Sequence, residues 1–368
     1  MTRRAATKHN SEWLEVQANV PREKCGLVMV AMDDSQFEAI LDIEAKSKVN
    51  GEDVRIITPE QLRLLEPDLE VASEAKAALY SPEEYVVDAY LMALSNLYVA
   101  LFHGCQLETR CRVIHVEKDS NLWKVSAEKR NNSEEAGKLS QAFFLAKKVI
   151  NCGGNYSDEL DSLVPRTIDE TPPFTIEPAR GEYLVYEEDH HESKGPRGMV
   201  TEVPTKDYAG LYIFKSVYGH YVVGPTNIPQ ESKEDRGCSV DNVAKLESHI
   251  FKFFPGLKRH KLVAVYSGLR PRALESLDYQ IRFNHDKSWA TLGAIRSTGL
   301  TASRAIAEYC AKNMFANYET MARKPDVVMP LPKIEGGQGL IRVGDFTFRP
   351  THKLSQLGLT PKPKRSSL

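Results

Sequence analysis

The sequence predicts a mixed α/β (α+β) fold in which segments from both halves of the chain complete one lobe around a β-rich middle. Three observations predict it. Apolar residues recur at helical spacing over 88–103, strand-like patterns dominate 106–150 and 174–225, and a strand-to-helix run returns at 292–303. With 368 residues, of which 42% are hydrophobic and 27% charged, the chain can bury a large core, organised as two interleaved lobes.

The first hundred residues predict a strand and two helices before the helix at 88–103. The short, Val-rich run 24–31 is typical of a buried strand. Asp34 or Ser35 is a candidate cap for the next helix, which Asn50-Gly51 ends. Thr58-Pro59-Glu60-Gln61 combines an N-cap, a proline at the first helical position and a glutamine at the third, so it predicts another helix start.

The rest of the chain predicts strands separated by polar and glycine turns, with three more helices. Strands are expected at 113–117, 123–127, 147–152, 183–186, 210–215 and 221–224, with a polar hairpin tip at 129–138. Helices are expected near Ser157, over 239–254, and from about Thr301 to Tyr318. Residues 321–368 are rich in proline, glycine and charge, and we expect them to form a C-terminal arm or a disordered tail.

Composition excludes several classes of protein. A formal net charge of -2 gives no reason to expect a nucleic acid or an anionic membrane as partner. No apolar run approaches the roughly 18 residues of a transmembrane helix. Six cysteines without C-x-x-C spacing argue against a disulfide framework and a zinc site, so no metal is expected. We therefore expect an intracellular protein. The basic first residues resemble a mitochondrial transit peptide, with the cytoplasm and the peroxisome as alternatives.

The run Gly268-Leu269-Arg270-Pro271 is the first candidate for chemistry. Proline biases the preceding Arg270 toward extended geometry, and Gly268 lets the backbone pass close to a bulky group. A guanidinium fixed in this way suits bidentate capture of a carboxylate or a phosphate. The alternative is a structural salt bridge of Arg270 at a strand end.

A second candidate is the strand-to-helix run that contains Gly293, Gly299, Leu300 and Thr301. Helix N-termini present free N–H groups and the positive end of the helix dipole, so they bind anions or electron-rich rings. Glycines at the two ends of the connection would let the backbone graze a planar ring. The alternative is a plain turn with Thr301 as the helix cap.

Three further candidates have weaker signals. Gly153 and Gly154 end a buried strand, a position that borders the ligand crevice of many doubly wound sheets, or they form an ordinary tight turn. His220, at the start of an apolar strand, is a candidate proton acceptor or a hairpin residue. Lys206 is a candidate contact for a substrate anion or a surface lysine.

Taken in order, these runs resemble the DAO superfamily of FAD-dependent oxidoreductases, nearest its glycerol-3-phosphate dehydrogenase and L-2-hydroxyglutarate dehydrogenase branch. The resemblance covers roughly residues 12–315. The matching stretches include Cys25-Gly26-Leu27-Val28, Asn151-Cys152-Gly153-Gly154, Glu177-Pro178-Ala179-Arg180-Gly181-Glu182-Tyr183, Gly224-Pro225-Thr226, Ser267 to Pro271 and Gly299 to Ala307.

The resemblance implies FAD as the cofactor and hydride transfer to it from the carbon that carries a hydroxyl or amine. The substrate would be a small 2-hydroxy acid, a glycerol phosphate or a related amine, with its anionic end held by Arg270. Gly299 to Ser303 would cradle the flavin, and the Asn151 to Gly154 turn would approach the pyrophosphate and adenosine. The electron acceptor stays open.

The resemblance also implies a division of the chain. Residues 1–320 would form the DAO-type domain, with a substrate lobe at approximately 20–100 and 170–285. A partial Rossmann-like FAD lobe would comprise approximately 105–165 and 286–320. The family's opening G-x-G-x-x-G unit is not found in the sequence, and Gly336-Gly337-Gln338-Gly339 does not have its spacing. We therefore expect an N-terminally truncated member, with a non-catalytic protein that cannot bind FAD as the alternative.

Overall fold

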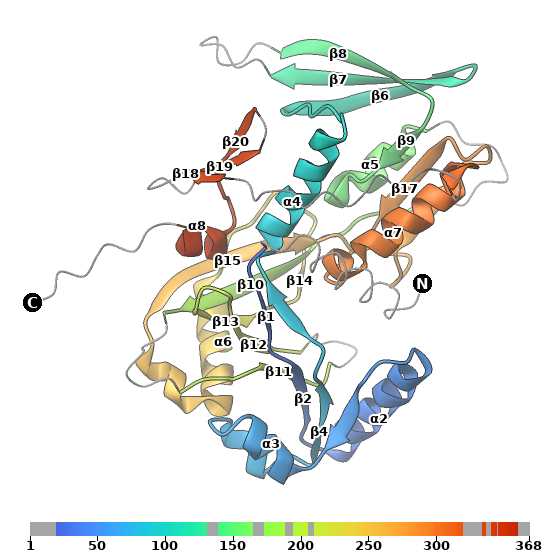
Figure 1. Cartoon of the computed structure of the whole chain (residues 1–368). Helices are drawn as coiled ribbons and strands as arrows, with labels where there is room; N and C mark the ends of the chain where they lie inside the picture. The colour runs from blue at the N-terminus through green and yellow to red at the C-terminus, as the bar shows by residue number, and fades with distance from the viewer. Residues whose placement is uncertain are drawn as a thin grey trace, which may run out of the picture.

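The computed structural model describes residues 20–130, 139–164, 173–187, 194–204, 210–318, 333–335, 340–343 and 345–359. The α-helices of these residues are α2 (Asp34–Val49), α3 (Pro59–Leu65), α4 (Ala89–Phe102), α5 (Ser157–Ser162), α6 (Val240–Phe253), α7 (Gly299–Met314) and α8 (Lys353–Leu359). Short 3₁₀ helices lie at Glu70–Ser73, Gly154–Tyr156 and Pro255–Arg259. Figure 1 shows the arrangement of these elements.

A nine-stranded sheet is the largest among the described residues, with the order β14-β10-β13-β12-β11-β2-β4-β3 and with β15 also paired to β10. All its pairs are antiparallel except β2 with β11. The strands are β2 (Leu27–Ala31), β3 (Arg55–Ile57), β4 (Ala77–Ser81), β10 (Ala179–Tyr186), β11 (Met199–Glu202), β12 (Tyr212–Lys215), β13 (Tyr221–Gly224), β14 (Ile228–Pro229) and β15 (Leu262–Arg270). This sheet is broad and mostly antiparallel, as the sequence predicts.

A second sheet joins the middle of the chain to its later part. It comprises β9 (Val149–Asn151), β17 (Trp289–Gly293) and β16 (Gln280–Phe283). β17 runs parallel to β9 and antiparallel to β16. Since α5 and α7 both contact β17, this unit is a small α/β layer (Figure 1). The two runs that the sequence singles out, after β9 and after β17, therefore end neighbouring parallel strands.

Three smaller sheets lie around these two. The long antiparallel sheet of β6 (Cys111–Asp119), β7 (Leu122–Arg130) and β8 (Leu139–Ala146) stands at one end of the molecule (Figure 1). β1 (Arg22–Lys24) pairs with β5 (Tyr85–Val87). Near the C-terminus, β18 (Lys333–Glu335), β19 (Leu340–Val343) and β20 (Phe346–Phe348) form an antiparallel sheet.

The main core lies between the large sheet and the helices that cover it. Ile250 and Phe254 from α6 and its C-terminal end are buried against sheet residues such as Val223, and Leu62 of α3 is buried in the same cluster. A separate cluster joins α4 to β19, where Ile341 is fully buried. Apolar burial of this kind stabilises a fold by about 25 cal/mol per Å² of surface removed from water, so β19 is integrated into the structure.

Helix starts follow the sequence prediction with two small shifts. Thr58 and Gln61 form both hydrogen bonds of a capping box around Pro59. Asp33, rather than Asp34 or Ser35, caps α2: its side chain accepts a hydrogen bond from the Gln36 N–H. α7 begins at Gly299, two residues before Thr301. Several strands, among them β3, β4, β8, β11, β16 and most of β15, were not predicted.

The C-terminal prediction is refined by the structure. Within 321–368, the described residues form β18 to β20 and α8, which fits an arm better than a disordered tail. Among the described residues, no helix has both the length and the apolar character needed to cross a membrane.

Candidate active site

A row of three residues on β15 defines the candidate site. Tyr266, Gly268 and Arg270 alternate along the strand, so their side chains share one face of the sheet. The register on β10 places Tyr183 opposite Tyr266 and Gly181 opposite Gly268. The face therefore has tyrosines at one end, a pair of glycines in the middle and an arginine at the other end.

Gly268 leaves room above the sheet, whereas Gly181 opposite it is covered by the Arg270 guanidinium and by Pro225. A Cβ built on Gly268 would meet no atom within 4 Å. On one side of this space the Tyr183 and Tyr266 rings stack, with centroids 4.9 Å apart and planes 8° from parallel. The space above Gly268 therefore lies between the stacked tyrosine rings and Arg270. This space could accept a small molecule.

The Arg270 side chain is held across Gly181. Its Nη2 donates a hydrogen bond to the Thr226 carbonyl oxygen at 2.5 Å. The same Nη2 lies only 2.8 Å from the position of a Cβ on Gly181, so any larger residue there would displace the guanidinium. Glycine at 181 is therefore needed for space, and the Thr226 carbonyl fixes the direction of the cation.

The electrostatics of Arg270 favour an anion. Burial lowers the pKa of Arg270 from its ordinary value, and the nearby Arg296 charge lowers it further, while Tyr183 opposes both. No carboxylate among the described residues forms an ion pair with Arg270, so the structural salt bridge that was the alternative for this residue is not found in that part of the chain. Two neighbouring guanidinium groups repel each other, and a bound anion would relieve that repulsion.

The N-terminus of α7 follows the same region of the chain. Thr298 is its N-cap residue but makes no side-chain capping bond to the helix, because its hydroxyl contacts the Tyr279 hydroxyl instead. Gly299 packs tightly on Ile295, and Arg296 donates to the Leu277 carbonyl oxygen. The 16-residue helix therefore begins at Gly299, with Leu300 and Thr301 in its first turn and the positive end of its dipole beside them.

The turn after β9 is tightly organised. The Asn151 side chain donates to the Ser157 carbonyl oxygen at 2.8 Å and accepts from the Gly153 N–H at 2.9 Å. Gly154 has a φ of +58°, and a Cβ there would meet nothing within 4 Å. Next to it, side-chain oxygens of Asn155 and Ser157 are buried without a hydrogen-bond partner among the described residues. Such atoms favour a polar ligand at this turn.

Gly293, by contrast, is covered by protein. A Cβ on it would lie 2.5 Å from the Phe174 ring and 3.0 Å from the Ser157 hydroxyl. The structure therefore places this glycine in close packing against Phe174, where no planar ring of a ligand reaches it.

His220 and Lys206 are not brought to the row. His220 precedes Tyr221, which pairs with Tyr186 at the end of β10, whereas Arg270 pairs with Ala179 at its start. The two residues thus lie at opposite ends of an eight-residue strand. His220 is buried in the β12–β13 turn, where its N–H donates to the Ser216 hydroxyl. Lys206 lies outside the described residues.

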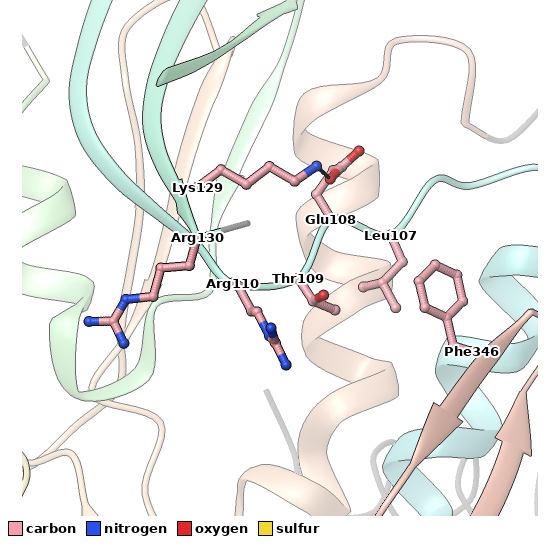
Figure 2. A pocket seen from close by; sticks show the side chains of 7 residues that line it. All are labelled: Leu107, Glu108, Thr109, Arg110, Lys129, Arg130 and Phe346. Carbon is pink, nitrogen blue, oxygen red and sulfur yellow. Dashed lines mark hydrogen bonds and ion pairs between the residues drawn. The ribbon is translucent and has the colours of Figure 1, made fainter. Parts of the chain in front are cut away.

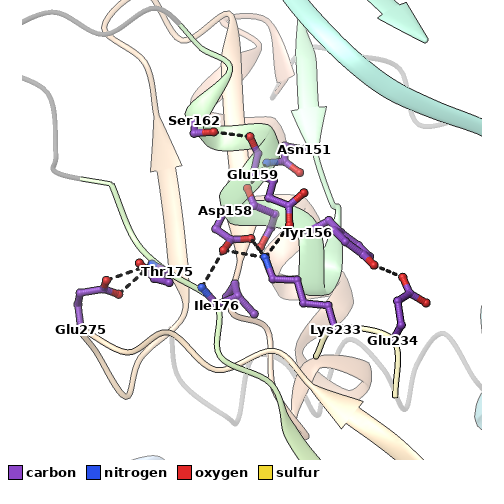
Figure 3. A network of polar contacts seen from close by, with 11 residues as sticks. Asn151, Tyr156, Asp158, Glu159, Ser162, Thr175, Ile176, Lys233, Glu234 and Glu275 are labelled. Atoms are coloured by element: carbon purple, nitrogen blue, oxygen red, sulfur yellow. Dashed lines mark hydrogen bonds and ion pairs between the residues drawn. The ribbon is translucent and has the colours of Figure 1, made fainter. Parts of the chain in front are cut away.

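The small sheet and the large sheet are tied together near the turn after β9 (Figure 3). Lys233 donates to both carboxylate oxygens of Asp158, at 2.8 and 2.9 Å, and to Glu159 at 3.0 Å. Asp158 also accepts from the Ile176 N–H at 2.9 Å. These contacts join α5, which packs on the small sheet, to two segments of the large sheet. Ile176 lies just before β10, and Lys233 lies just after β14.

A separate cavity of about 320 Å³ lies between the end of the β6–β7 hairpin, the segment before it and β20 (Figure 2). Arg110 and Arg130 line it, and Lys129 beside them is paired with Glu108. None of the residues of the Tyr266–Arg270 row lines this cavity. We assign the candidate site to the face of β10 and β15, because that face carries Arg270 and the stacked tyrosines.

Sequence reasoning found Arg270 but missed Tyr183, Tyr266, Gly181 and Arg296. The tyrosine in Glu182-Tyr183 and the tyrosine in Tyr266-Ser267 are 83 positions apart, and only the pairing of β10 with β15 brings them together. The alternation of Tyr266, Gly268 and Arg270 was a readable signal, since residues two apart on a strand share a face.

Comparison with known proteins shows the family of the chain. The sequence profile of the family described as FAD dependent oxidoreductase (DAO) matches residues 1–313. Glycerol 3-phosphate oxidase of Mycoplasma pneumoniae is 27% identical over 301 residues, which are 78% of this chain and 71% of that protein. A mitochondrial L-2-hydroxyglutarate dehydrogenase of Nematostella vectensis is 25% identical over 227 residues, which are 59% of this chain and 46% of that protein.

Solved structures show the same fold. Dithionite-reduced L-alpha-glycerophosphate oxidase from Mycoplasma pneumoniae, with FAD bound, superposes with a TM-score of 0.70 at 23% identity. The superposition covers 87% of this chain and 82% of that one. The mixed α/β fold predicted from the sequence is thereby confirmed as the DAO type.

Proposed function

The chain belongs to the family of FAD-dependent oxidoreductases, and on that premise we propose that it oxidises a small anionic substrate bound on the face of β10 and β15. Glycerol 3-phosphate is the first candidate, and 2-hydroxy acids and related amines are the others. The observation that carries this proposal is Arg270, a half-buried cation that pairs with no carboxylate of the described residues.

FAD, when bound, supplies the redox chemistry by accepting the two electrons that the substrate loses as its C–H and O–H become a carbonyl. The residues present fit such a group in two places. The first turn of α7, from Gly299 to Thr301, offers a helix N-terminus to the electron-rich ring. The turn after β9 offers open space at Gly154, and two unpartnered buried oxygens on Asn155 and Ser157, to the polar part.

The chain's own residues bind and orient the substrate. Arg270 would hold the anionic end, since its Nη2 is fixed by Thr226 and its other N–H groups can reach an oxyanion. The stacked Tyr183 and Tyr266 rings would exclude water from one side of the bound molecule. The bare floor at Gly268 would let the carbon skeleton lie close to the sheet.

The preference for a phosphate is supported by the relatives. The proteins with which this chain shares 27% and 22% identity over about four fifths of its length are named glycerol 3-phosphate oxidase and glycerol 3-phosphate dehydrogenase.

The test is spectroscopic. The purified chain, saturated with added FAD and then freed of unbound FAD, should retain the yellow colour of bound flavin. Anaerobic addition of glycerol 3-phosphate should bleach that colour, and L-lactate and L-2-hydroxyglutarate serve as the carboxylate comparison. Bleaching by a 2-hydroxy acid and not by glycerol 3-phosphate would contradict the preference for phosphate.

A non-catalytic role is the second candidate, and one observation favours it. The 368 residues contain no G-x-G-x-x-G, the segment that usually holds the dinucleotide pyrophosphate. Under this reading the folded chain stays colourless after incubation with FAD, whereas the enzymatic reading requires retained flavin. The same experiment therefore decides between the two.

A further inference from the structure

The C-terminal segment, residues 340–343 and 345–359, reaches the candidate site from outside the sheets that form it. Ile341 and Val343 of β19 are fully buried in the cluster with Leu91 and Met92 of α4. α8 follows and lies beside β15 (Figure 1). The segment is therefore docked on the body of the protein at α4.

Asp88 anchors α8 at a single buried point. Its carboxylate, in a residue that is 5% exposed, accepts hydrogen bonds from the Ser355 hydroxyl at 2.9 Å and the Tyr218 hydroxyl at 2.7 Å. Gly358 of α8 packs flat on the Tyr218 ring, so closely that a Cβ there would collide with it. A buried carboxylate that accepts several hydrogen bonds fixes its donors in place, and here it fixes α8.

This anchoring places His352 on the aromatic wall of the site. The His352 and Tyr266 ring centroids are 5.0 Å apart with the planes at 64°, an edge-to-face contact. Tyr266 stacks on Tyr183 at 4.9 Å. The Tyr266 ring is thus held by one ring from the same sheet and by one ring from the C-terminal segment.

The His352 ring is suited to an uncharged contact. Burial lowers the pKa of His352 from its ordinary value, and Asp88 opposes this shift. Burial also raises the pKa of the Tyr266 hydroxyl, which stays protonated. Both shifts favour the neutral forms of the two rings, which pack as an aromatic pair.

We propose that His352 is a positioning residue of the substrate site: its edge holds the Tyr266 ring in the orientation that, with Tyr183, faces Arg270 across Gly268. The proposal rests on the proposed function, because it takes this face as the place where the anionic substrate binds. His352 acts through Tyr266 and takes no part in the chemical step.

The proposal predicts that removing the His352 ring weakens substrate binding and that another aromatic ring at position 352 restores it. Loss of one aromatic edge contact should weaken substrate binding about three- to tenfold. His352→Ala should therefore raise KM for glycerol 3-phosphate and Kd for inorganic phosphate by that factor, with a smaller change in kcat. His352→Phe keeps the ring and should restore both values. Lys353→Ala, an exposed neighbour on α8, is the matched control and should behave as wild type.

A second variant perturbs α8 without touching the site. Gly358→Ala would drive a methyl group into the Tyr218 ring and loosen α8 from Asp88. It should reproduce the rise in KM and Kd of His352→Ala while Tyr266 and His352 keep their side chains. The flavin content and the thermal midpoint of each variant show whether its main fold is intact.

The outcomes separate the two proposals. If the wild type binds phosphate and is reduced by glycerol 3-phosphate, but His352→Ala matches it in KM and Kd, the role of His352 is overturned and the proposed function stands. The same holds if His352→Phe is as defective as His352→Ala, since the ring contact then does not carry the effect. If the wild type neither binds phosphate nor is reduced, the proposed function falls and this inference falls with it.

Discussion

The Arg270 guanidinium lies over Gly181, with its Nη2 2.8 Å from the place of a Cβ on that glycine and 2.5 Å from the Thr226 carbonyl oxygen. The position of the cation thus depends on the absence of a side chain on the neighbouring strand. Arg270 carries the charge, its place on β15 directs it to this face of the sheet, and the missing side chain at Gly181 leaves space for its guanidinium.

Gly181→Ala should impair binding and leave the fold intact. The added methyl meets the far end of the Arg270 side chain, which can move away, but it also lies 3.0 Å from the Pro225 Cβ, so the free energy of unfolding should fall by about 1 to 3 kcal/mol. The displaced guanidinium should raise KM for glycerol 3-phosphate about tenfold, equivalent to about 1.4 kcal/mol. Steady-state kinetics and thermal unfolding measure the two quantities. A wild-type KM would show that substrate binding does not depend on the position of the Arg270 guanidinium over residue 181.

Lys233→Met should destabilise the protein, because it removes the cation from Asp158 and Glu159 while those carboxylates stay near each other. Lys233 and Asp158 are only 16% and 10% exposed. Burial alone would lower the pKa of Lys233, but the hydrogen bonds of Asp158 and Glu159 outweigh it and raise the pKa. Hydrogen bonds to charged groups contribute about 1.5 to 3 kcal/mol, and we expect a loss in that range by urea unfolding.

Lys46→Met is the control for that prediction. Lys46 pairs with Asp42 on the surface of α2, where the two side chains are 74% and 60% exposed. An exposed pair contributes less than about 1 kcal/mol, so Lys46→Met should change stability little. Equal losses of unfolding free energy in the two variants would show that the contact of Lys233 with α5 is no stronger than a surface ion pair.

Thr58→Ala should lower stability by about 1 kcal/mol, because it removes the hydroxyl that accepts from the Gln61 N–H at the start of α3. The site is untouched, so KM should stay at its wild-type value. Thermal unfolding measures the loss. A change in KM as large as that of Gly181→Ala would mean that general destabilisation, rather than the position of Arg270, controls binding.

The docking of α8 should weaken in acid. The pKa of His352 is lowered in the folded protein, so the unfolded or undocked histidine binds a proton more readily. Its contribution to docking is therefore complete above the ordinary histidine pKa of about 6.5 and is lost as the pH falls through the lower folded value. The groups that face it are Asp88 on α4, Tyr266 on β15 and, through Asp88, the Tyr218 hydroxyl.

Amide hydrogen exchange of α8 at pH 7.5 and at pH 5.5 checks this. Exchange should be faster at the lower pH in the wild type, after correction for the intrinsic rate, and the difference should shrink in His352→Phe. An unchanged pH dependence in His352→Phe would assign the effect to another group.

Local signals in the sequence determined much of the fold. Thr58-Pro59-Glu60-Gln61 specifies a helix start by chemistry contained in four residues, and the structure has that capping box. The Gly268-Leu269-Arg270-Pro271 run likewise identified Arg270 as a fixed cation from its neighbours alone. The capping box could be predicted because its determining contacts lie within a few positions of one another, and the role of Arg270 stays a prediction.

The rest of the site depends on register between distant strands. Nothing near Tyr183 in the sequence indicates Tyr266, and nothing near either one indicates His352, more than eighty positions further on. The same reason explains Gly293, whose partner Phe174 lies more than a hundred positions earlier and covers the surface that a ligand ring would need. It also explains His220, a reasonable proton acceptor by residue type that the β13–β10 pairing puts at the far end of the sheet from Arg270.

The central claim is that Arg270 binds the anionic end of the substrate beside bound flavin. Anaerobic reduction of the flavin by increasing concentrations of glycerol 3-phosphate, in the wild type and in Arg270→Ala with equal flavin content, tests it most directly. We predict that the wild type bleaches with saturation, and that Arg270→Ala needs on the order of 10 to 100 times more substrate, in line with the loss of about 1.5 to 3 kcal/mol. Bleaching of both proteins at the same substrate concentration would contradict the account.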